Sequence, residues 1–327
     1  MTFAFRFADP HTAERYPLNV TGELGWQHDN DCYSAEIPLP EISSGTIVVP
    51  SLSICRDASY SFRFSLNFSD QIFALNEVPS SSNGPSSHHV PSSEKAPAGR
   101  PAEAENKHPI STHIDCFHTH QHIPTSTLRV EVKGFSNAEQ YLLCVTARSI
   151  TCEEVAIPQR AVHCPSPPSL SQMQANDKIK HSICSPTCLA MLLQHFDRPI
   201  DWLDFVASCR DETTGLYGVW PLGIYAASRQ GCIGAVEVFD DWENAALLLE
   251  SELPFVASIR YPEGSLPGAP NAASGGHLVV VHRLDEDNIH VLDPAAPTVD
   301  EVARTYPQVA FSSAWLSHRG AVYVLLP

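Results

Sequence analysis

A proline-rich stretch near the middle of the chain separates two regions with different hydrophobic patterns. Residues 153–171 contain four prolines among polar neighbours, a composition typical of an extended connector. Before this stretch the apolar residues alternate as they do in β-strands, and after it they first recur at helical spacing. The chain has 327 residues, which is long for one ordinary domain. We therefore expect two domains, residues 1–152 and residues 172–327, joined by this linker.

The first region is rich in short runs of β-forming residues separated by Pro, Asn and Gly, which predicts an antiparallel β-sandwich. The clearest runs are Thr2–Phe7, Thr46–Val49, Tyr60–Phe68, Ser126–Val132 and Gln140–Ala147. Residues 79–109 interrupt this pattern with six prolines, seven serines and a single large apolar residue, Val90. Such a composition cannot bury enough apolar surface to order the chain. We expect a disordered insertion within the sandwich.

The second region begins with a helical pattern and continues with strands. Leu189, Leu192, Leu193 and Phe196 follow the spacing of one helix face, with Ser185 expected as the N-cap and Pro186 at the first helical position. The pattern predicts further helices at Ile200–Ser208, Trp220–Gln230 and Trp242–Leu249, and strands at Phe255–Tyr261, His277–Leu284, Asn288–Leu292 and Ala321–Leu326. Helices followed by a sheet indicate the α+β class.

Charge and hydropathy exclude several classes of partner. The chain carries 37 acidic and 20 basic residues, a net charge of −17. A field of this sign repels nucleic acid and anionic membrane surfaces, so we expect neither as a partner. No apolar run approaches the roughly 18 residues that span a bilayer, and the first residues do not form an export signal. Ten cysteines without a CxxC pair indicate a reducing, cytoplasmic location.

Three separate positions have the chemistry of nucleophilic catalysis. Cys184 directly precedes the expected start of a helix, where backbone N–H groups and the helix dipole lower a thiol pKa. His277 opens an apolar strand after two glycines, and Asp293 ends the next strand. If residues 285–288 close a hairpin, His277 and Asp293 lie side by side. His277 would then take the thiol proton while Asp293 orients the imidazole.

The oxyanion of the resulting tetrahedral intermediate needs hydrogen-bond donors. We expect the backbone N–H of Cys184 to supply one. The side-chain amide of Gln172 or of Gln174 could supply another, and the sequence leaves the choice between them open.

Several motifs of the second region resemble those of a known family. They are Gln172, Cys184-Ser185-Pro186-Thr187, Met191, Tyr217-Gly218-Val219-Trp220-Pro221, Gly276-His277 and Asp293-Pro294-Ala295-Ala296, continuing to Tyr306, Phe311 and Trp315. This set looks like the peptidase C39-like proteins, papain-fold relatives of the peptidase domains that process double-glycine leaders in bacteriocin exporters. The resemblance covers about residues 172–327.

The resemblance implies a papain-like cysteine peptidase domain with Cys184 as nucleophile, His277 as base, Asp293 as third member and Gln172 as oxyanion donor. In the exporter peptidases the glutamine lies a few residues before the nucleophile, whereas Gln172 lies twelve residues before Cys184. We therefore expect a looped insertion here. The implied partner is a peptide or protein substrate, with no cofactor and no metal, and the oligomeric state stays open.

Other interpretations compete with this one. Cys116, His118, His120 and His122 alternate and could bind zinc or copper on a strand, although a solvated polar strand fits the pattern better. Cys188, one helical turn after the nucleophile, could resolve an oxidised thiol but is more typical of a buried small residue. A catalytically silent binding protein, with a sandwich that recognises carbohydrate or protein, and an acyltransferase of transglutaminase type are the alternative functions.

Overall fold

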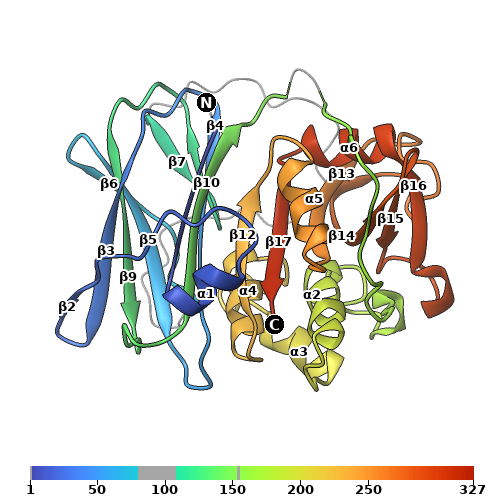
Figure 1. Ribbon diagram of the computed structural model, residues 1–327, viewed down its shortest axis with the longest axis horizontal. Helices are drawn as coiled ribbons and strands as arrows, with labels where there is room; N and C mark the ends of the chain where they lie inside the picture. The colour runs from blue at the N-terminus through green and yellow to red at the C-terminus, as the bar shows by residue number, and fades with distance from the viewer. Residues whose placement is uncertain (1, 80–107, 153–154) are drawn as a thin grey trace.

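The computed structural model describes residues 2–79, 108–152 and 155–327. The chain is mixed α and β, with mostly antiparallel sheets. Figure 1 shows the strands of the first half on one side and the helices and strands of the second half on the other. Residues 80–107, which make up nearly all of the expected insertion, lie outside the described residues.

The described residues of the first half form two five-stranded antiparallel sheets. One has the order β1-β10-β4-β8-β7 and the other β2-β3-β9-β5-β6. The strands are β1 (Phe3–Ala8), β2 (Gln27–Asp29), β3 (Cys32–Leu39), β4 (Thr46–Ile54), β5 (Ser61–Phe68), β6 (Gln71–Ala74), β7 (Ile110–Thr112), β8 (Phe117–Thr119), β9 (Ser126–Lys133) and β10 (Tyr141–Ser149), with the short helix α1 (Pro10–Arg15) after β1. One apolar cluster contains residues of both sheets, among them Phe64 and Val145.

The burial of residues along individual strands explains why the sequence of the first half predicts β-strands. In β9, every second residue from Ser126 to Val132 is buried, the alternation of a strand with one face on a core. By contrast, all nine residues of β4 are buried. A strand covered on both faces lies between two layers of the protein.

Residues 155–327 form a seven-stranded antiparallel sheet and five helices of the α type. The path β12-β17-β13-β14-β15-β16 forms the sheet, and β11 pairs with β14 beside it. The strands are β11 (Val162–His163), β12 (Ile233–Val238), β13 (Phe255–Tyr261), β14 (Ser274–Leu284), β15 (Asn288–Leu292), β16 (Ala303–Pro307) and β17 (Ala321–Leu326). The helices are α2 (Cys184–His195), α3 (Trp202–Ser208), α4 (Trp220–Ser228), α5 (Glu243–Glu250) and α6 (Gln308–Leu316), with the 3-10 turns η1 (Gln172–Gln174) and η2 (Val299–Glu301).

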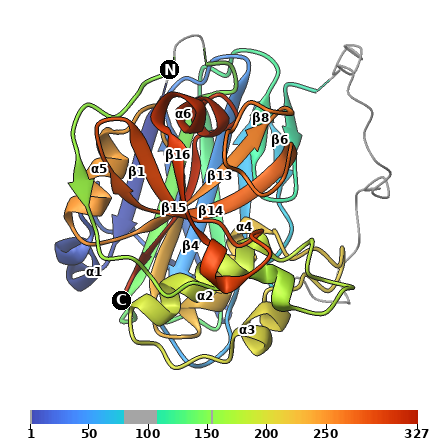
Figure 2. The same ribbon diagram turned by 90° about the vertical axis from the view of Figure 1, so that its right-hand side faces the viewer.

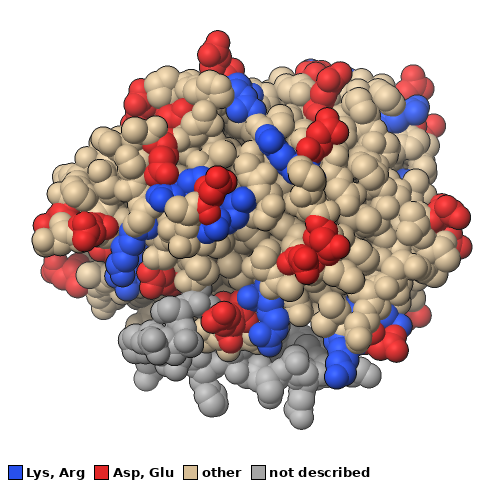
Figure 3. All heavy atoms as spheres, turned by 90° about the horizontal axis from the view of Figure 1, so that it is seen from below, with Lys and Arg blue, Asp and Glu red and all other residues tan. Residues whose placement is uncertain are grey.

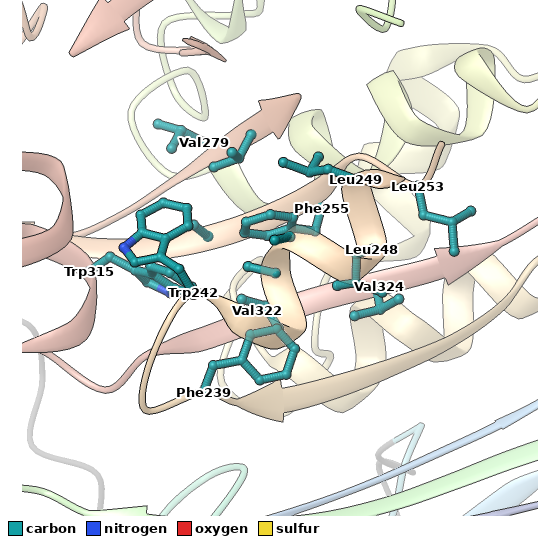
Figure 4. Packing of buried hydrophobic residues seen from close by; sticks show 14 of the residues in the cluster. Phe239, Trp242, Leu248, Leu249, Leu253, Phe255, Val279, Trp315, Val322 and Val324 are labelled. Carbon is teal, nitrogen blue, oxygen red and sulfur yellow. The ribbon is translucent and has the colours of Figure 1, made fainter. Parts of the chain in front are cut away.

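Two apolar clusters cover the two faces of this sheet. Residues of α5 and α6 belong to one cluster, and residues of α2 and α4 belong to the other (Figure 2). In the first cluster the rings of Trp242 and Trp315 meet edge to face with centroids 4.7 Å apart (Figure 4). Such edge-to-face pairs add to the stabilisation from buried area alone. Helices on both faces thus hold the strands that carry the histidine and the aspartate.

The two halves are joined through a continuous core. Strand β4 contacts β12, and Ile47 and Val49 share a cluster with α2 and α4. Figure 1 shows β12 and α4 next to the strands of the first half. Within this interface Arg6 of β1 binds Glu237 of β12 through two side-chain nitrogens, and both residues are buried. The second half is therefore fixed to the first by apolar packing and by a buried ion pair.

Most of the expected elements of the second half are present, with some differences. Strands β13, β15 and β17 have the expected bounds, whereas β12, β16 and α6 were not expected from the sequence. Val162 and His163, within the expected connector, pair with β14. No helix in the described ranges is both long and apolar enough to cross a bilayer. On the face in Figure 3, basic side chains lie among acidic ones.

Candidate active site

Cys184 is the first residue of α2, and this corrects the expected helix start. Ile183 is the N-cap and offers no side-chain cap. The hydroxyl of Ser185, expected as the cap, instead shares a hydrogen bond of 2.8 Å with the hydroxyl of Tyr323 on β17. A buried partner on the sheet therefore replaces the local capping contact. Cys184 itself lies in the first turn, where unpaired backbone N–H groups favour a negative charge.

The Cys184 sulfur lies among hydrogen-bond donors. The His277 side chain and the backbone N–H groups of Leu278 and Ser185 all act on it. Burial works to raise the pKa of the Cys184 thiol, but the hydrogen bond and positive charge of His277 outweigh burial and lower it below its ordinary value. Cys184 is half-buried, so one side of the residue stays accessible.

His277 and Asp293 meet at the end of the β14–β15 hairpin. Val280 pairs with Leu292, and the backbone N–H of Asp285 donates to the carbonyl of Asn288 in the hairpin turn. His277 Nε2 lies 2.7 Å from Asp293 Oδ1. This contact occupies Nε2, so the other ring nitrogen, Nδ1, is the one left to face Cys184. The three expected residues thus form a continuous line of side chains.

Asp293 is fully buried and is held by three donors. Besides His277, the backbone N–H of Ala295 donates to Oδ1 at 2.9 Å, and the Tyr306 hydroxyl donates to Oδ2 at 2.6 Å. Burial acts to raise the pKa of Asp293, but the His277 charge and these hydrogen bonds lower it. The ionised carboxylate in turn overcomes the desolvation of His277 and raises the pKa of His277 to about 10. The arrangement favours a thiolate beside an imidazolium.

Gln172 and Gln174, the two candidate oxyanion donors, have different surroundings. Gln172 is 4% exposed in η1, and its Nε2 donates to the carbonyl of Lys180 at 2.7 Å. Its Oε1 is buried with no partner among the described residues. Gln174 is exposed, and its Nε2 contacts the carbonyl of Pro297 at 3.3 Å. The turn that follows η1 therefore fixes the amide of Gln172, and the amide of Gln174 is directed elsewhere.

Two glycines before His277 border open space. A Cβ added at Gly275 or Gly276 would meet nothing within 4 Å, and both residues are exposed. Gly218, before α4, is exposed in the same way. Internal packing does not require glycine at these positions. The backbone beside His277 can therefore be approached closely from outside.

Sequence reasoning missed two buried contacts near this site. It noted Tyr306 only as a continuation of the family pattern and not as a donor to Asp293. It also missed Asp115, a buried residue of the first half whose carboxylate accepts the backbone N–H of Trp220 at the start of α4. Neither contact has a local signal, because each joins residues that are far apart in the sequence.

The cysteine and histidines between residues 116 and 122 are not arranged as a set of metal ligands. Cys116 is buried, His118 Nε2 lies 3.6 Å from its sulfur, and His120 bonds to Ser111 at 2.8 Å. Within the described ranges, no group of three or more His, Cys, Asp or Glu is arranged to hold a metal ion. Cys188 is buried, and its thiol donates to the carbonyl of Leu278 at 3.3 Å.

Comparison with known proteins places the second half in a family. The model of the Peptidase_C39 like family matches residues 167–323. A search of the curated proteins gave no match.

Three solved structures are similar to about half of the chain. A protein from Bacillus anthracis described as a C39-like peptidase has 14% identity and a TM-score of 0.39, over 52% of this chain and 98% of that one. A double glycine motif protease from the AMS/PCAT transporter, in complex with the leader peptide, has 16% identity and a TM-score of 0.34, over 52% and 99%. The peptidase domain of Streptococcus ComA, a bi-functional ABC transporter, has 16% identity and a TM-score of 0.34, over 49% and 97%. On the family match, residues 167–323 of this chain belong to the peptidase C39-like family.

Proposed function

We propose that the protein is a cysteine peptidase that hydrolyses a peptide bond with Cys184, His277 and Asp293 as its catalytic triad. The observation that carries this proposal is the continuous line from the half-buried Cys184 through the imidazole to a carboxylate 2.7 Å from the ring. The lowered pKa of Cys184 and the raised pKa of His277 favour the thiolate–imidazolium pair at neutral pH. A thiolate is the reactive form of cysteine.

In the proposed reaction the thiolate attacks the carbonyl carbon of the scissile bond, and the carbonyl electrons move to oxygen. The backbone N–H of Cys184 and the second N–H of Gln172 Nε2 bind this oxyanion. When the intermediate collapses, the C–N bond breaks and the leaving amine takes a proton from His277. A thioester remains on Cys184. Water then attacks the thioester, gives its proton to His277, and the thiolate leaves as the acid is released.

Asp293 has a supporting role in this proposal. Its Oδ1 accepts the hydrogen bond from His277 Nε2 and fixes the ring so that Nδ1 faces the sulfur. Its negative charge stabilises the imidazolium. We assign Gln172 in preference to Gln174 as oxyanion donor, because Gln172 is buried and its orientation is fixed by Lys180.

We also propose that residues 1–152 form a β-sandwich domain, with residues 153–171 leading into the peptidase domain at 172–327. The shared apolar cluster between the two N-terminal sheets supports this division. The buried cysteines of both halves, among them Cys144 and Cys188, are free thiols, which supports a reducing compartment such as the cytoplasm.

Thiol labelling and product analysis of the full chain test the function. We expect Cys184→Ala to lose rapid iodoacetamide labelling at pH 6.5 and to cleave no member of a peptide library, as read by mass spectrometry. Cys55→Ala is the matched control, because Cys55 is also half-buried and burial raises its pKa. Cleavage by Cys184→Ala at the wild-type rate would refute the assignment. Products joined to an added amine would identify an acyltransferase in place of a hydrolase.

A further inference from the structure

A group of cationic and imidazole side chains lies at the same end of the sheet as His277. Ile259 of β13 pairs with His277, and on the other side of β13 the pairs Val256–Tyr323 and Ala257–Val322 set the register of β17. Continuing that register by two residues from the pair Ala257–Val322 places Gly320 beside Ile259. His277, Ile259 and Gly320 therefore lie in one row across the sheet. Arg260 and Arg319 are the next residues beyond this row. Neighbouring strands are about 4.8 Å apart, so the Arg319 backbone lies roughly 10 Å from that of His277.

Both arginine side chains are held in place by contacts with uncharged groups, which leave their positive charges without an ion-pair partner among the described residues. The guanidinium of Arg319 lies over the Trp220 ring, 5.5 Å from its centroid, and Arg260 Nε donates to the carbonyl of Gly275 at 2.9 Å. Within the described residues, neither arginine has a carboxylate within 4.0 Å. The Asp115 charge acts on Arg319, but this carboxylate is 5% exposed and already accepts the N–H of Trp220. An anion from outside therefore meets two available positive charges.

Histidines from both halves of the molecule surround Arg319. His318 precedes it in the chain, and from the first half the tilted rings of His113 and His118 lie with their centroids 3.9 Å apart. Burial and the charges of His113 and Arg319 lower the pKa of His118 to about 3, and burial and the charge of Arg319 lower that of His318 to about 4. Neutral imidazoles at pH 7 add hydrogen-bond donors without adding charge. Side chains of both halves therefore form this polar group.

We propose that Arg319 and Arg260, with the histidines beside them, bind a carboxylate of the peptide substrate. This proposal rests on the proposed function, because it places the carboxylate relative to the bond that Cys184 would attack. An extended peptide rises about 3.3 Å per residue, so the carboxylate lies about three residues from the scissile bond. It belongs to an Asp or Glu side chain or to the C-terminus of the substrate. A planar guanidinium suits either source.

Matched peptide substrates test this proposal. We expect wild-type protein to cleave peptides with Glu at the third residue on one side of the bond, or with a free C-terminus there, about 10- to 100-fold faster in kcat/KM than peptides with Gln or a C-terminal amide. Comparison of the Glu peptides with the peptides that end in a free C-terminus shows which of the two carboxylates is bound. Arg319→Gln should lose this preference and Arg319→Lys should keep part of it, both with wild-type labelling of Cys184. Arg283→Gln, an exposed arginine at the other end of β14, is the control.

A binding measurement keeps the proposal testable if no peptide is cleaved. In Cys184→Ala protein labelled with ¹⁵N-histidine, N-acetyl-glutamate methylamide should shift the imidazole signals of His118 and His318, and N-acetyl-glutamine methylamide should not. Arg319→Gln should abolish the shift. An unchanged spectrum, or a wild-type preference for acidic peptides retained in Arg319→Gln, would overturn the carboxylate site. Slow labelling of Cys184 at pH 6.5 alongside a normal shift would overturn the peptidase and leave the carboxylate site standing.

Discussion

Two buried clusters of this protein contain the same kinds of side chain and give their cysteines opposite properties. At the junction of the halves, Glu237 is surrounded by Arg6, Tyr16 and Cys144. At the candidate active site, Asp293 has His277 and Tyr306 as partners, and Cys184 lies beyond the histidine. Burial and the Glu237 charge raise the pKa of Cys144 well above its ordinary value, whereas that of Cys184 is lowered.

The position of the cation explains the difference. Arg6 binds Glu237 directly, and the Cys144 sulfur lies 3.8 Å from the same carboxylate, so a thiolate there would face a negative charge. At the other site His277 lies between the carboxylate and Cys184, so a thiolate faces a positive charge. The junction cluster is also sealed, since Cys144 is fully buried, whereas Cys184 is partly accessible. Burial of an ion pair therefore gives a reactive thiol only when the cation faces the sulfur.

Removal of the cation next to Cys184 should have the largest effect. We expect His277→Gln to lower kcat/KM by about 10²- to 10⁴-fold, because both the proton donor and the charge that stabilises the thiolate are lost. The pKa of Cys184 should rise, so iodoacetamide labelling at pH 6.5 should slow. Thermal unfolding of the variant checks that it is folded. A wild-type labelling rate in folded His277→Gln would show that the histidine does not activate the thiol.

Removal of the cation at the junction should change stability and leave the thiol chemistry alone. Arg6→Met leaves the Glu237 carboxylate buried without its charge partner, which costs about 3–5 kcal/mol in the free energy of unfolding. Urea denaturation measures this loss. The double variant Arg6→Met/Glu237→Leu should recover most of it, because no unpaired charge remains. If the double variant is as unstable as the single one, apolar packing rather than the charge explains the defect.

The pH dependence separates the two kinds of cysteine. An ordinary thiol with a pKa of about 8.5 is roughly 1% ionised at pH 6.5. Since the pKa of Cys184 is lowered, its labelling at pH 6.5 should be up to about 100-fold faster than that of an ordinary thiol. The difference from Cys55, which is also half-buried, should be larger still because burial raises the pKa of Cys55. The raised pKa of His277, about 10, places the alkaline loss of the ion pair near that pH.

The pH profile of kcat/KM should therefore be bell-shaped. Its acid limb should lie below the ordinary thiol value and its alkaline limb near pH 10. Peptide mapping of the labelled cysteines identifies which thiol reacts at each pH. A labelling midpoint of Cys184 near 8.5 would favour the catalytically silent alternative.

The smallest effect should come from the two tyrosines. Tyr306→Phe removes a donor to Asp293 and raises the pKa of that carboxylate, so we expect kcat/KM to fall about 5- to 10-fold. Tyr16→Phe is the matched change at the junction and should cost about 1 kcal/mol in stability with no change in kcat/KM. Equal kinetic effects of the two variants would rule out a specific role for Tyr306.

Local patterns predicted those parts of the fold that depend on near neighbours. Strands β15 and β17 have the expected bounds, because their runs of apolar residues are short and clearly bounded. The meeting of His277 with Asp293 was predictable because a hairpin joins their strands. The start of α2 was predicted two residues too late, since the hydroxyl of Ser185 bonds to Tyr323, a residue 138 positions away, and does not cap the helix.

The sequence by itself determined which residues of the second half are candidates for catalysis, because a cysteine at a helix start and a histidine and aspartate on one hairpin are local features. Only the tertiary structure decided which charges meet. It brought Arg6 to Glu237 across 231 residues and Asp115 to the start of α4. The physical reason is that burial and charge pairing, which set each pKa, depend on distances in space that residue type and order do not specify.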